Sequence, residues 1–333
     1  MEKSTSPPEA LGQSEAFLAF MERLSLAAKV DRPVLIIGER GTGKELAAAR
    51  LHYLSSRWQE SLVTLNCAAL APSLIEDELF GHEPGAFTGA QGSRQGRFEA
   101  AHQGTLFLDE LGIMPPTVQE KVLRVVEYGS FERVGGSRSI QVDVRILGAT
   151  NQNLKDLAQG QKFKQDLLDR LSFEVLMIPP LRQRGGDILL LANHFAARMS
   201  HELGRSQMPT LSPEAMSELM DYSWPGNVRE LKNVVERAVY RSQEPVIKSV
   251  EFDPFAALDL SETAGRPPAK EIKPDPPQAS FKEAVLGFER SLLQDALHKA
   301  RFNQKRAAQD LGLTYHQLRG LLRKHGGLDN LLS

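Results

Sequence analysis

The chain has 333 residues, of which 41% are hydrophobic and 25% are charged, with a formal net charge of −2. These values are typical of a globular protein with two or three domains. Because Cys67 is the sole cysteine, an intrachain disulfide and a cysteine-based metal site are excluded. No secretion signal opens the sequence and no apolar run is as long as a membrane span, so we expect a cytoplasmic protein without membrane insertion.

The first half of the chain alternates between helical and strand patterns. Apolar residues at helical spacing follow Ser14, which is expected to cap this first helix. A buried strand over residues 34–37 leads through a glycine-rich turn into a helix over 44–55. Further short apolar runs cover residues 62–65, 105–108, 142–149 and 173–178. This alternation predicts an α/β fold, with a parallel sheet covered by helices on both faces.

After Pro179 and Pro180 the strand patterns stop, and the remaining elements are helical. Helices are predicted over residues 188–202, 212–222 and 228–241, the last one capped by Asn227. Prolines between residues 267 and 277 predict an extended linker, which precedes a helical block over 281–325. We therefore expect domains at 1–180 and 181–252, a Pro-rich linker at 253–280, and a C-terminal domain at 281–333.

A P-loop pattern lies between the first predicted strand and the next helix. Its glycines allow backbone N–H groups to face nucleotide phosphates, and Lys44 would reach the β- and γ-phosphate oxygens. Glu45 stands where Ser or Thr usually ligates Mg²⁺, and the alternative is a glycine-rich turn without a ligand. The residues expected to bind ATP here are Gly38, Glu39, Arg40, Gly41, Thr42, Gly43, Lys44 and Glu45.

A second part of the nucleotide site follows the strand at residues 105–108. This strand ends in two carboxylates, Asp109 and Glu110, which is the Walker B pattern. Asp109 would hold Mg²⁺ directly or through water, and Glu110 would polarise the attacking water. Downstream of a P-loop, this pattern indicates hydrolysis of ATP with Mg²⁺.

Residues 85–90 spell the hexapeptide GAFTGA. Four further motifs match the same family in the expected order, at residues 65–69, 149–151, 166–170 and 224–231. Over residues 11–252 the chain thus resembles the sigma-54-interaction domain of bacterial enhancer-binding proteins, a branch of the AAA+ ATPases. The resemblance implies an AAA+ α/β subdomain at 1–180 and a helical lid at 181–252.

The resemblance also assigns roles within one subunit. Asn66 would be a switch that couples Glu110 to the nucleotide state, although it could instead cap a helix. Thr150 and Asn151 would sense the γ-phosphate, and Arg229 would be a second sensor, unless it is a surface ion-pair partner.

Between subunits, the resemblance makes Arg170 an arginine finger that reaches a neighbour's ATP, which implies a ring, expected to be a hexamer. The simpler reading is a solvated helix residue. Lys164 stands where the family usually has Arg; it keeps the charge but loses the planar fork. Gln183 replaces a usual Glu within residues 180–188.

The segment over residues 79–98 is polar and rich in glycine, which predicts a mobile loop. The resemblance implies that this loop contacts the sigma-54 RNA polymerase holoenzyme, with Phe87 and Thr88 at its tip. Hydrolysis would then remodel the closed promoter complex. The alternative is a surface loop with Phe87 in the core. The contact residues would be Gly85, Ala86, Phe87, Thr88, Gly89 and Ala90.

The C-terminal block is basic, with seven Lys or Arg and one acid, Asp310, between His298 and His325, a local charge of +6. Residues 303–325 predict helix, turn at Gly312, helix, and resemble the Fis-type helix-turn-helix, which binds double-stranded enhancer DNA. A hairpin used for packing is the alternative. The expected DNA-binding residues are Lys305, Arg306, Thr314, Tyr315, His316, Gln317, Arg319, Arg323 and Lys324. A dimer seam is expected at Phe288, Leu292, Leu293 and Leu297.

About ten residues precede the ATPase region, so control is expected from a partner or from expression level. Residues 34–46, 51–58 and 303–325 resemble the branch of the family that activates phage shock (envelope stress) operons and is restrained by an inhibitor acting in trans. Trp58 would be a docking residue for such an inhibitor or a packing residue. Competing interpretations are an AAA+ remodeller of another class and a non-hydrolysing DNA-binding regulator.

Overall fold

The computed structural model describes residues 10–87, 92–205, 207–255, 281–300 and 303–325, with the backbone alone for 281–284. The chain separates into two compact units, Met1–Pro254 and Phe255–Ser333. Across the described ranges, no helix combines the length and the apolar character needed to cross a bilayer. Most of the predicted linker, residues 256–280, lies outside the described residues.

Within the described part of the first unit, five parallel strands form the central sheet, in the order β2-β5-β8-β1-β9. The predicted parallel α/β fold is therefore confirmed. The register pairs Asn66 with Asp109 and Ile37 with Thr150, so the carboxyl ends of these strands share an edge. The strands are β1 (Val34–Ile37), β2 (Leu62–Asn66), β5 (Thr105–Asp109), β8 (Arg145–Thr150) and β9 (Glu174–Met177).

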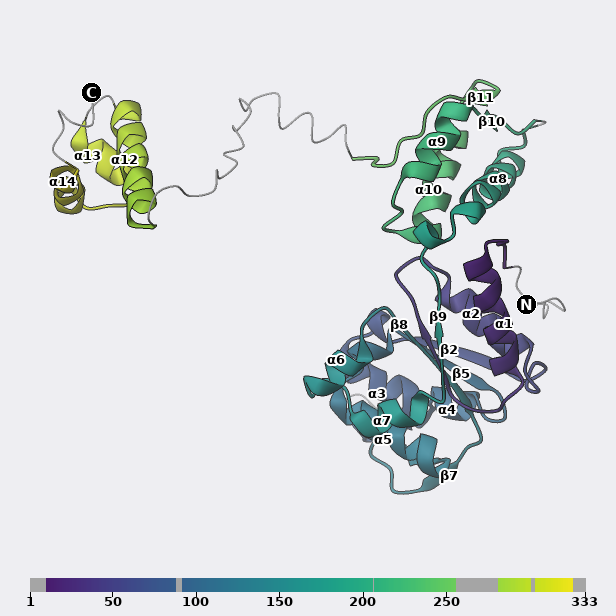
Figure 1. Cartoon of the computed structure of the whole chain (residues 1–333). Coiled ribbons are helices and arrows are strands. Elements are labelled where there is room, and N and C mark those ends of the chain that lie inside the picture. The colour runs from purple at the N-terminus through teal and green to yellow at the C-terminus, as the bar shows by residue number, and fades with distance from the viewer. Residues whose placement is uncertain (1–9, 88–91, 206, 256–280, 301–302, 326–333) are drawn as a thin grey trace. The chain divides into compact units, whose positions relative to one another are not determined.

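Helices cover both faces of this sheet (Figure 1). On one face, α1 (Glu15–Ala28) and α2 (Lys44–Tyr53) bury apolar side chains against β1 and β9. A second apolar core fills the other face. Every residue of β5 is buried, with Leu106 and Leu108 in this second core and Phe107 in the first. The helices of that face are α3 (Pro72–Phe80), α4 (Arg97–Ala100), α5 (Pro116–Tyr128), α6 (Leu154–Gln159) and α7 (Gln165–Leu171).

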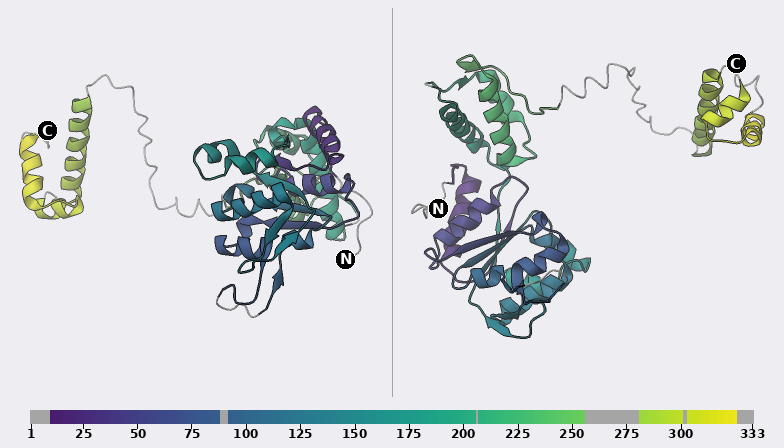
Figure 2. Two further views of the ribbon diagram at one scale, coloured as in Figure 1. Left: turned by 90° about the horizontal axis from the view of Figure 1, so that it is seen from below. Right: turned by 180° about the vertical axis from the view of Figure 1, so that it is seen from behind.

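The described part of the GAFTGA segment, residues 85–87, follows β3 (Gly81–His82), which pairs antiparallel with β4 (Arg94–Gln95) in a hairpin. A second hairpin pairs β6 (Ser130–Glu132) with β7 (Ser139–Gln141). The hairpins meet where His82 pairs with Val134, and Figure 2 shows them extending from the α/β layers.

The lid contains α8 (Gly185–Glu202), α9 (Pro213–Asp221) and α10 (Asn227–Arg241), as predicted. A short parallel pair, β10 (Thr210–Leu211) with β11 (Val246–Ile247), was not predicted. The lid has its own apolar core around Trp224, whose indole N–H donates to the carbonyl of Leu219 at 2.9 Å.

Of the two predicted caps, Ser14 occupies the N-cap position of α1 and Asn227 does not occupy that of α10. Ser14 precedes α1, but its hydroxyl donates to Asp187 of α8 at 2.7 Å instead of capping its own helix. Asn227 is the first residue of α10, with a φ of +53°, and Gly226 takes the cap position. In both cases a tertiary partner binds the side chain that local sequence assigns to a cap.

The second unit is a compact set of helices, α12 (Phe281–Lys299), α13 (Gln304–Asp310) and α14 (Tyr315–Lys324). The turn at Gly312 has a φ of +65°, and Thr314 caps α14 in a capping box with Gln317, as a helix-turn-helix requires. The predicted dimer seam is partly wrong, because Leu293 and Leu297 are buried in the core of this unit. Phe288 and Leu292 of that seam are exposed.

Candidate functional site

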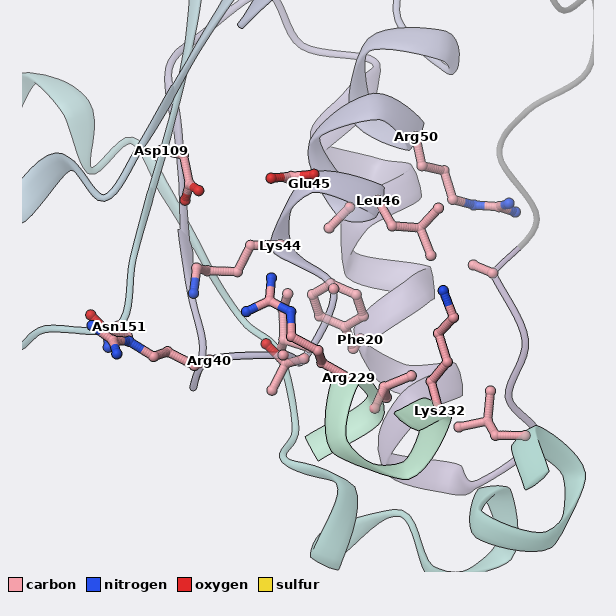
Figure 3. A pocket seen from close by; sticks show the side chains of 18 of the residues that line it. Phe20, Arg40, Lys44, Glu45, Leu46, Arg50, Asp109, Asn151, Arg229 and Lys232 are labelled. Carbon is pink, nitrogen blue, oxygen red and sulfur yellow. The ribbon is translucent and has the colours of Figure 1, made fainter. Parts of the chain in front are cut away.

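A cavity of about 810 Å³ opens at the carboxyl ends of β1, β5 and β8, between the sheet and the lid. The P-loop and the Walker B strand both reach it, as does the lid helix α10. Figure 3 shows Lys44 and Asp109 on the sheet side and Arg229 extending from α10 toward Lys44. The predicted nucleotide-binding residues that line it are Arg40, Gly41, Thr42, Gly43, Lys44, Glu45, Asn66, Asp109, Glu110, Asn151 and Arg229.

The P-loop wraps around the ammonium group of Lys44. Gly41 and Gly43 have φ angles of +78° and +101°, which residues with a side chain rarely adopt. Lys44 begins α2 and is buried, and its Nζ donates to the carbonyl of Gly38 at 3.1 Å. The loop thus combines an ammonium group with the start of a helix, a combination that fits the phosphates of a nucleotide.

The two carboxylates of the Walker B strand lie at its end, beside Asn66. The Asn66 amide donates to Oδ2 of Asp109 at 3.2 Å, while Oδ1 of Asp109 accepts the N–H of Glu110 at 3.0 Å. Burial raises the pKa of the nearby Cys67 thiol to about 12, and the charges of Asp109 and Glu110 add to this. Carboxylate oxygens such as those of Asp109 and Glu110 suit a Mg²⁺ ion that nucleotide phosphates also bind.

The Asn66 side chain makes two hydrogen bonds at the end of β2, and one of them confirms the predicted helix cap. Its side-chain oxygen accepts the N–H of Ala68 at 2.8 Å, which caps the short helix Cys67–Ala69. Its amide group is bonded to Asp109, whereas the resemblance couples it to Glu110. The side chain therefore lies at the carboxylates, where a switch residue is expected.

The two predicted γ-phosphate sensors at the end of β8 differ in whether they reach the cavity. Asn151 lines the cavity, and so does its neighbour Gln152, which the sequence did not single out. Thr150 is buried outside the cavity lining, and its hydroxyl accepts the N–H of Gln152 at 3.0 Å. Thr150 thus shapes the turn that carries Asn151.

Two P-loop residues of the predicted set, Gly38 and Glu39, do not line the cavity. The Glu39 carboxylate points to the lid, where Arg182 donates to both of its oxygens, at 2.6 and 2.8 Å. Hydrogen bonds from Arg182 and Asn227 lower the pKa of Glu39 to about 2. Glu39 is therefore bonded to the lid.

Arg170 and Lys164 also lie away from the cavity of their own chain. The Arg170 side chain is 60% exposed and forms an ion pair with Glu127 of α5 at 3.0 Å. Lys164 precedes α7 and pairs with Glu120 of the same α5 helix at 2.5 Å. Both cationic side chains thus lie on an accessible surface, each paired with a glutamate of α5.

Sequence reasoning missed the apolar side of the cavity. Residues from α1 and α8 line it, and no motif marks them, because their apolar spacing is that of any packed helix. The apolar ones are Phe17, Phe20, Met21, Leu191 and Phe195, and the polar His194 and Arg198 of α8 lie beside them.

In the GAFTGA loop, Phe87 is 48% exposed, so the alternative that places it in the core is wrong. Its ring lies edge-on to His82, with 5.0 Å between centroids. Gly85 has a φ of +82°, and Ala86 donates its N–H to the carbonyl of Glu83. Thr88, Gly89 and Ala90 lie outside the described residues.

The predicted DNA-binding residues lie on α13, on α14 and at the cap of α14. Tyr315 is partly buried against His316, and the Gln317 oxygen accepts from Thr314 in the capping box. Lys324 is exposed and pairs with Glu289 at 2.7 Å. The basic residues exposed on these helices are Lys305, Arg306, Arg319, Arg323 and Lys324.

Comparison with known families covers both units. Residues 10–177 match the sigma-54 interaction domain, residues 182–265 the AAA+ ATPase lid domain, and residues 287–325 the Fis family of bacterial regulatory proteins. The predicted AAA+ fold, lid and helix-turn-helix are thereby confirmed.

Individual relatives agree with these family matches. The Psp operon transcriptional activator of Escherichia coli K12 is 51% identical over 323 residues, covering 95% of this chain and 97% of that protein. The regulatory protein AtoC of the same strain is 43% identical over 95% of this chain and 67% of AtoC. NtrX from Brucella abortus, solved in complex with ATP, has a TM-score of 0.68 at 33% identity over 95% of this chain and 69% of NtrX. The chain therefore belongs to the family of sigma-54-dependent transcriptional activators with a Fis-type DNA-binding domain.

Proposed function

We propose that the chain hydrolyses ATP at the Lys44 and Asp109 cavity and uses the energy to remodel the closed complex of sigma-54 RNA polymerase at a promoter. The observation that carries this proposal is the shared cavity, which Lys44, Asp109, Glu110 and Arg229 all line. Mg²⁺ would neutralise charge on the phosphates, and Asp109 would hold it. Glu110 would orient and polarise the attacking water.

Hydrolysis would take place in a ring, for which a hexamer is expected. Arg170 lies on an accessible surface away from its own cavity, which supports a role at the ATP of a neighbouring subunit. A guanidinium suits this role because it spreads its charge over several phosphate oxygens. Lys164 lies on the same surface and would add a second, weaker contact in trans.

The GAFTGA loop would transmit the movement to sigma-54. Phe87 is exposed at the β3–β4 hairpin, which supports contact with a partner. Arg133, just after β6, binds Glu83 at 2.9 Å and Glu99 of α4 at 2.7 Å. This ion-pair network joins the base of the loop to the second hairpin, so both would move together.

The second unit would tether the activator to double-stranded enhancer DNA. α14 would enter the major groove with Tyr315, His316, Gln317 and Arg319, while Lys305, Arg306, Arg323 and Lys324 would contact phosphates. Dimerisation through this unit would use Phe288 and Leu292, which are 66% and 44% exposed on α12. Because RNA polymerase and promoter DNA would be its partners, the protein is proposed to work in the cytoplasm.

The target promoter would be a phage shock operon, because the 51% identical relative is the activator of the Psp operon. An inhibitor protein acting in trans would control the activity. Trp58 supports this proposal, because its side chain is 49% exposed, 6.0 Å from the Tyr53 ring, at a position accessible to a partner.

The experiment that tests the proposal separates hydrolysis from remodelling. The Thr88→Ala variant is expected to retain the steady-state ATPase rate of the wild type, since the P-loop and Walker B residues are unchanged. Open-complex formation at a sigma-54 promoter should be lost, because the contact to the sigma factor is altered. Normal open-complex formation by this variant would rule out the loop as the contact, and a wild-type chain without ATPase activity would rule out the remodelling mechanism.

A further inference from the structure

Glu39 is the one P-loop carboxylate between Gly38 and Lys44, and it is bonded to the lid. Arg182 lies in the short helix Leu181–Gln183, where the chain enters the lid, and its guanidinium forms a two-point contact with Glu39. Such a paired contact fixes orientation as well as distance. The end of the P-loop that precedes the phosphate-binding glycines is therefore linked to the entrance of the lid.

Asn227, the first residue of α10, completes this link. It is fully buried, and its amide donates to the Glu39 carboxylate at 3.1 Å and to the carbonyl of Arg40 at 3.1 Å. Its side-chain oxygen accepts the N–H of Leu181 at 2.8 Å. Its φ of +53° lies in the left-handed region, which Asn adopts more readily than most residues with a side chain. The link made by Glu39, Arg182 and Asn227 is called the P-loop clasp below.

Arg229 follows Asn227 of the P-loop clasp by two residues on α10. The carbonyl of Gly41 accepts the N–H of Arg229 at 3.3 Å. At Gly41 a Cβ would clash with the carbonyl oxygen of Gly226, so the loop and the start of α10 are in direct contact. The backbone that carries the Arg229 side chain is thus held by the loop that would bind the phosphates.

We propose that Glu39 is a positioning residue, which through Arg182 and Asn227 sets how far Arg229 extends over the nucleotide and so how well the site distinguishes ATP from ADP. This inference rests on the proposed nucleotide-binding function of the cavity. It assigns to Glu39 a role at the lid rather than at the phosphates. It also gives a role to Arg182, which precedes the Gln183 that departs from the family pattern.

The charge state of the P-loop clasp is constant at ordinary pH. Hydrogen bonds from Arg182 and then Asn227 lower the pKa of Glu39 from 4.5 to about 2. Because the folded pKa is lowered, the contribution of the clasp is complete above the unfolded value and is lost as pH falls through about 2. The effect of removing the charge should therefore be the same across about pH 6 to 9.

The test is a set of variants of the full chain, with ATP and ADP dissociation constants measured by fluorescence in the presence of Mg²⁺. Glu39→Gln is expected to lower the preference for ATP over ADP about fivefold, the effect of a charge-assisted pair that is partly exposed. In an Arg229→Ala background, Glu39→Gln should change the preference by less than about twofold, because Arg229 mediates the effect. A purely structural role would not depend on Arg229.

Arg182 provides the same test from the lid side. Arg182→Ala should reproduce the loss, and Glu39→Gln with Arg182→Ala should be no worse than either change alone. Arg182→Lys should restore part of the preference, because it keeps the charge without the planar fork. If Glu39→Gln does not fold, the exposed Arg182 side chain still allows the test to be made.

Glu174→Gln is the matched control, since Glu174 pairs with Arg23 at the same 2.6 Å distance but lies at the start of β9 and does not line the cavity. It should leave the preference unchanged. An unaltered preference in Glu39→Gln, or an equal loss with and without Arg229, would overturn the clasp. An Arg229→Ala variant with wild-type preference would overturn it as well, because the clasp is proposed to act through Arg229. Failure of the wild-type chain to bind nucleotide would instead refute the proposed nucleotide site.

Discussion

The nucleotide cavity and the helix-turn-helix are both proposed to bind phosphate groups, but they are built in different ways. In the cavity, Lys44 is 8% exposed and is held by loop carbonyls. On α13 and α14 the basic side chains are exposed, and among them Lys324 forms an ion pair with Glu289. One site concentrates its charge in a fixed geometry, and the other distributes it over a surface.

This difference determines how each site should respond to mutation. A buried charge acts at close range with little screening, so that each group in a preorganised site has a large effect. Exposed charges are screened by salt beyond about 10 Å and act mainly as a sum. We therefore expect large, specific losses at the cavity and small, additive losses on the DNA-binding helices.

Arg170 tests whether this comparison depends on exposure or on geometry. It is as exposed as a DNA-binding residue, yet it is proposed to stabilise charge at a neighbour's ATP. Arg170→Ala should lower the steady-state ATPase rate about 10³-fold or more, the usual effect of losing an arginine finger. ATP binding should remain close to that of the wild type, as measured by titration with a fluorescent nucleotide.

The control for Arg170 is Arg23→Ala. The Arg23 side chain is 58% exposed and forms an ion pair on the same unit, but it lies on α1. The Arg23→Ala variant should hydrolyse ATP at the wild-type rate. A normal rate in Arg170→Ala would show that exposure, rather than geometry in the ring, determines the response.

The parts of the cavity that could be predicted from sequence are those whose position follows from a local sequence pattern. The strand Thr105–Asp109 is a continuous apolar run, and such a run is buried in a parallel sheet whatever surrounds it. Asp109 must then emerge at the carboxyl edge, beside the P-loop. Lys44 and Asp109 could be placed for this reason.

The direction of polar side chains with distant partners could not be predicted. Glu39 belongs to the P-loop by sequence but is bonded to Arg182, 143 residues away. The local sequence around Asn227 suggests a helix cap. Its hydrogen-bond partner Glu39 is 188 residues away and is brought close only by the folding of the lid onto the P-loop. On α12, apolar spacing identifies a packed face but not its partner, so Leu293 and Leu297 were assigned to a dimer rather than to the core.

Arg319, on α14, is the exposed basic residue that is proposed to contact a base. Arg319→Ala should weaken binding to the specific site about tenfold to a hundredfold, the usual worth of a good base contact. Binding to random DNA should change much less. Electrophoretic mobility shifts with specific and scrambled duplexes measure both. An equal loss on both duplexes would place Arg319 on phosphate instead.

Lys305 is expected to give the smallest and most general effect. It is exposed near the start of α13, and its backbone N–H is bonded to the cap residue Asn303, so that the side chain is not needed to hold the helix. Lys305→Ala should lower affinity by a similar factor on specific and random DNA. The slope of log affinity against log salt should fall by about one, because one fewer phosphate is neutralised. An unchanged slope would show that Lys305 lies outside the DNA contact, and a loss confined to the specific site would show that this unit reads bases with both helices.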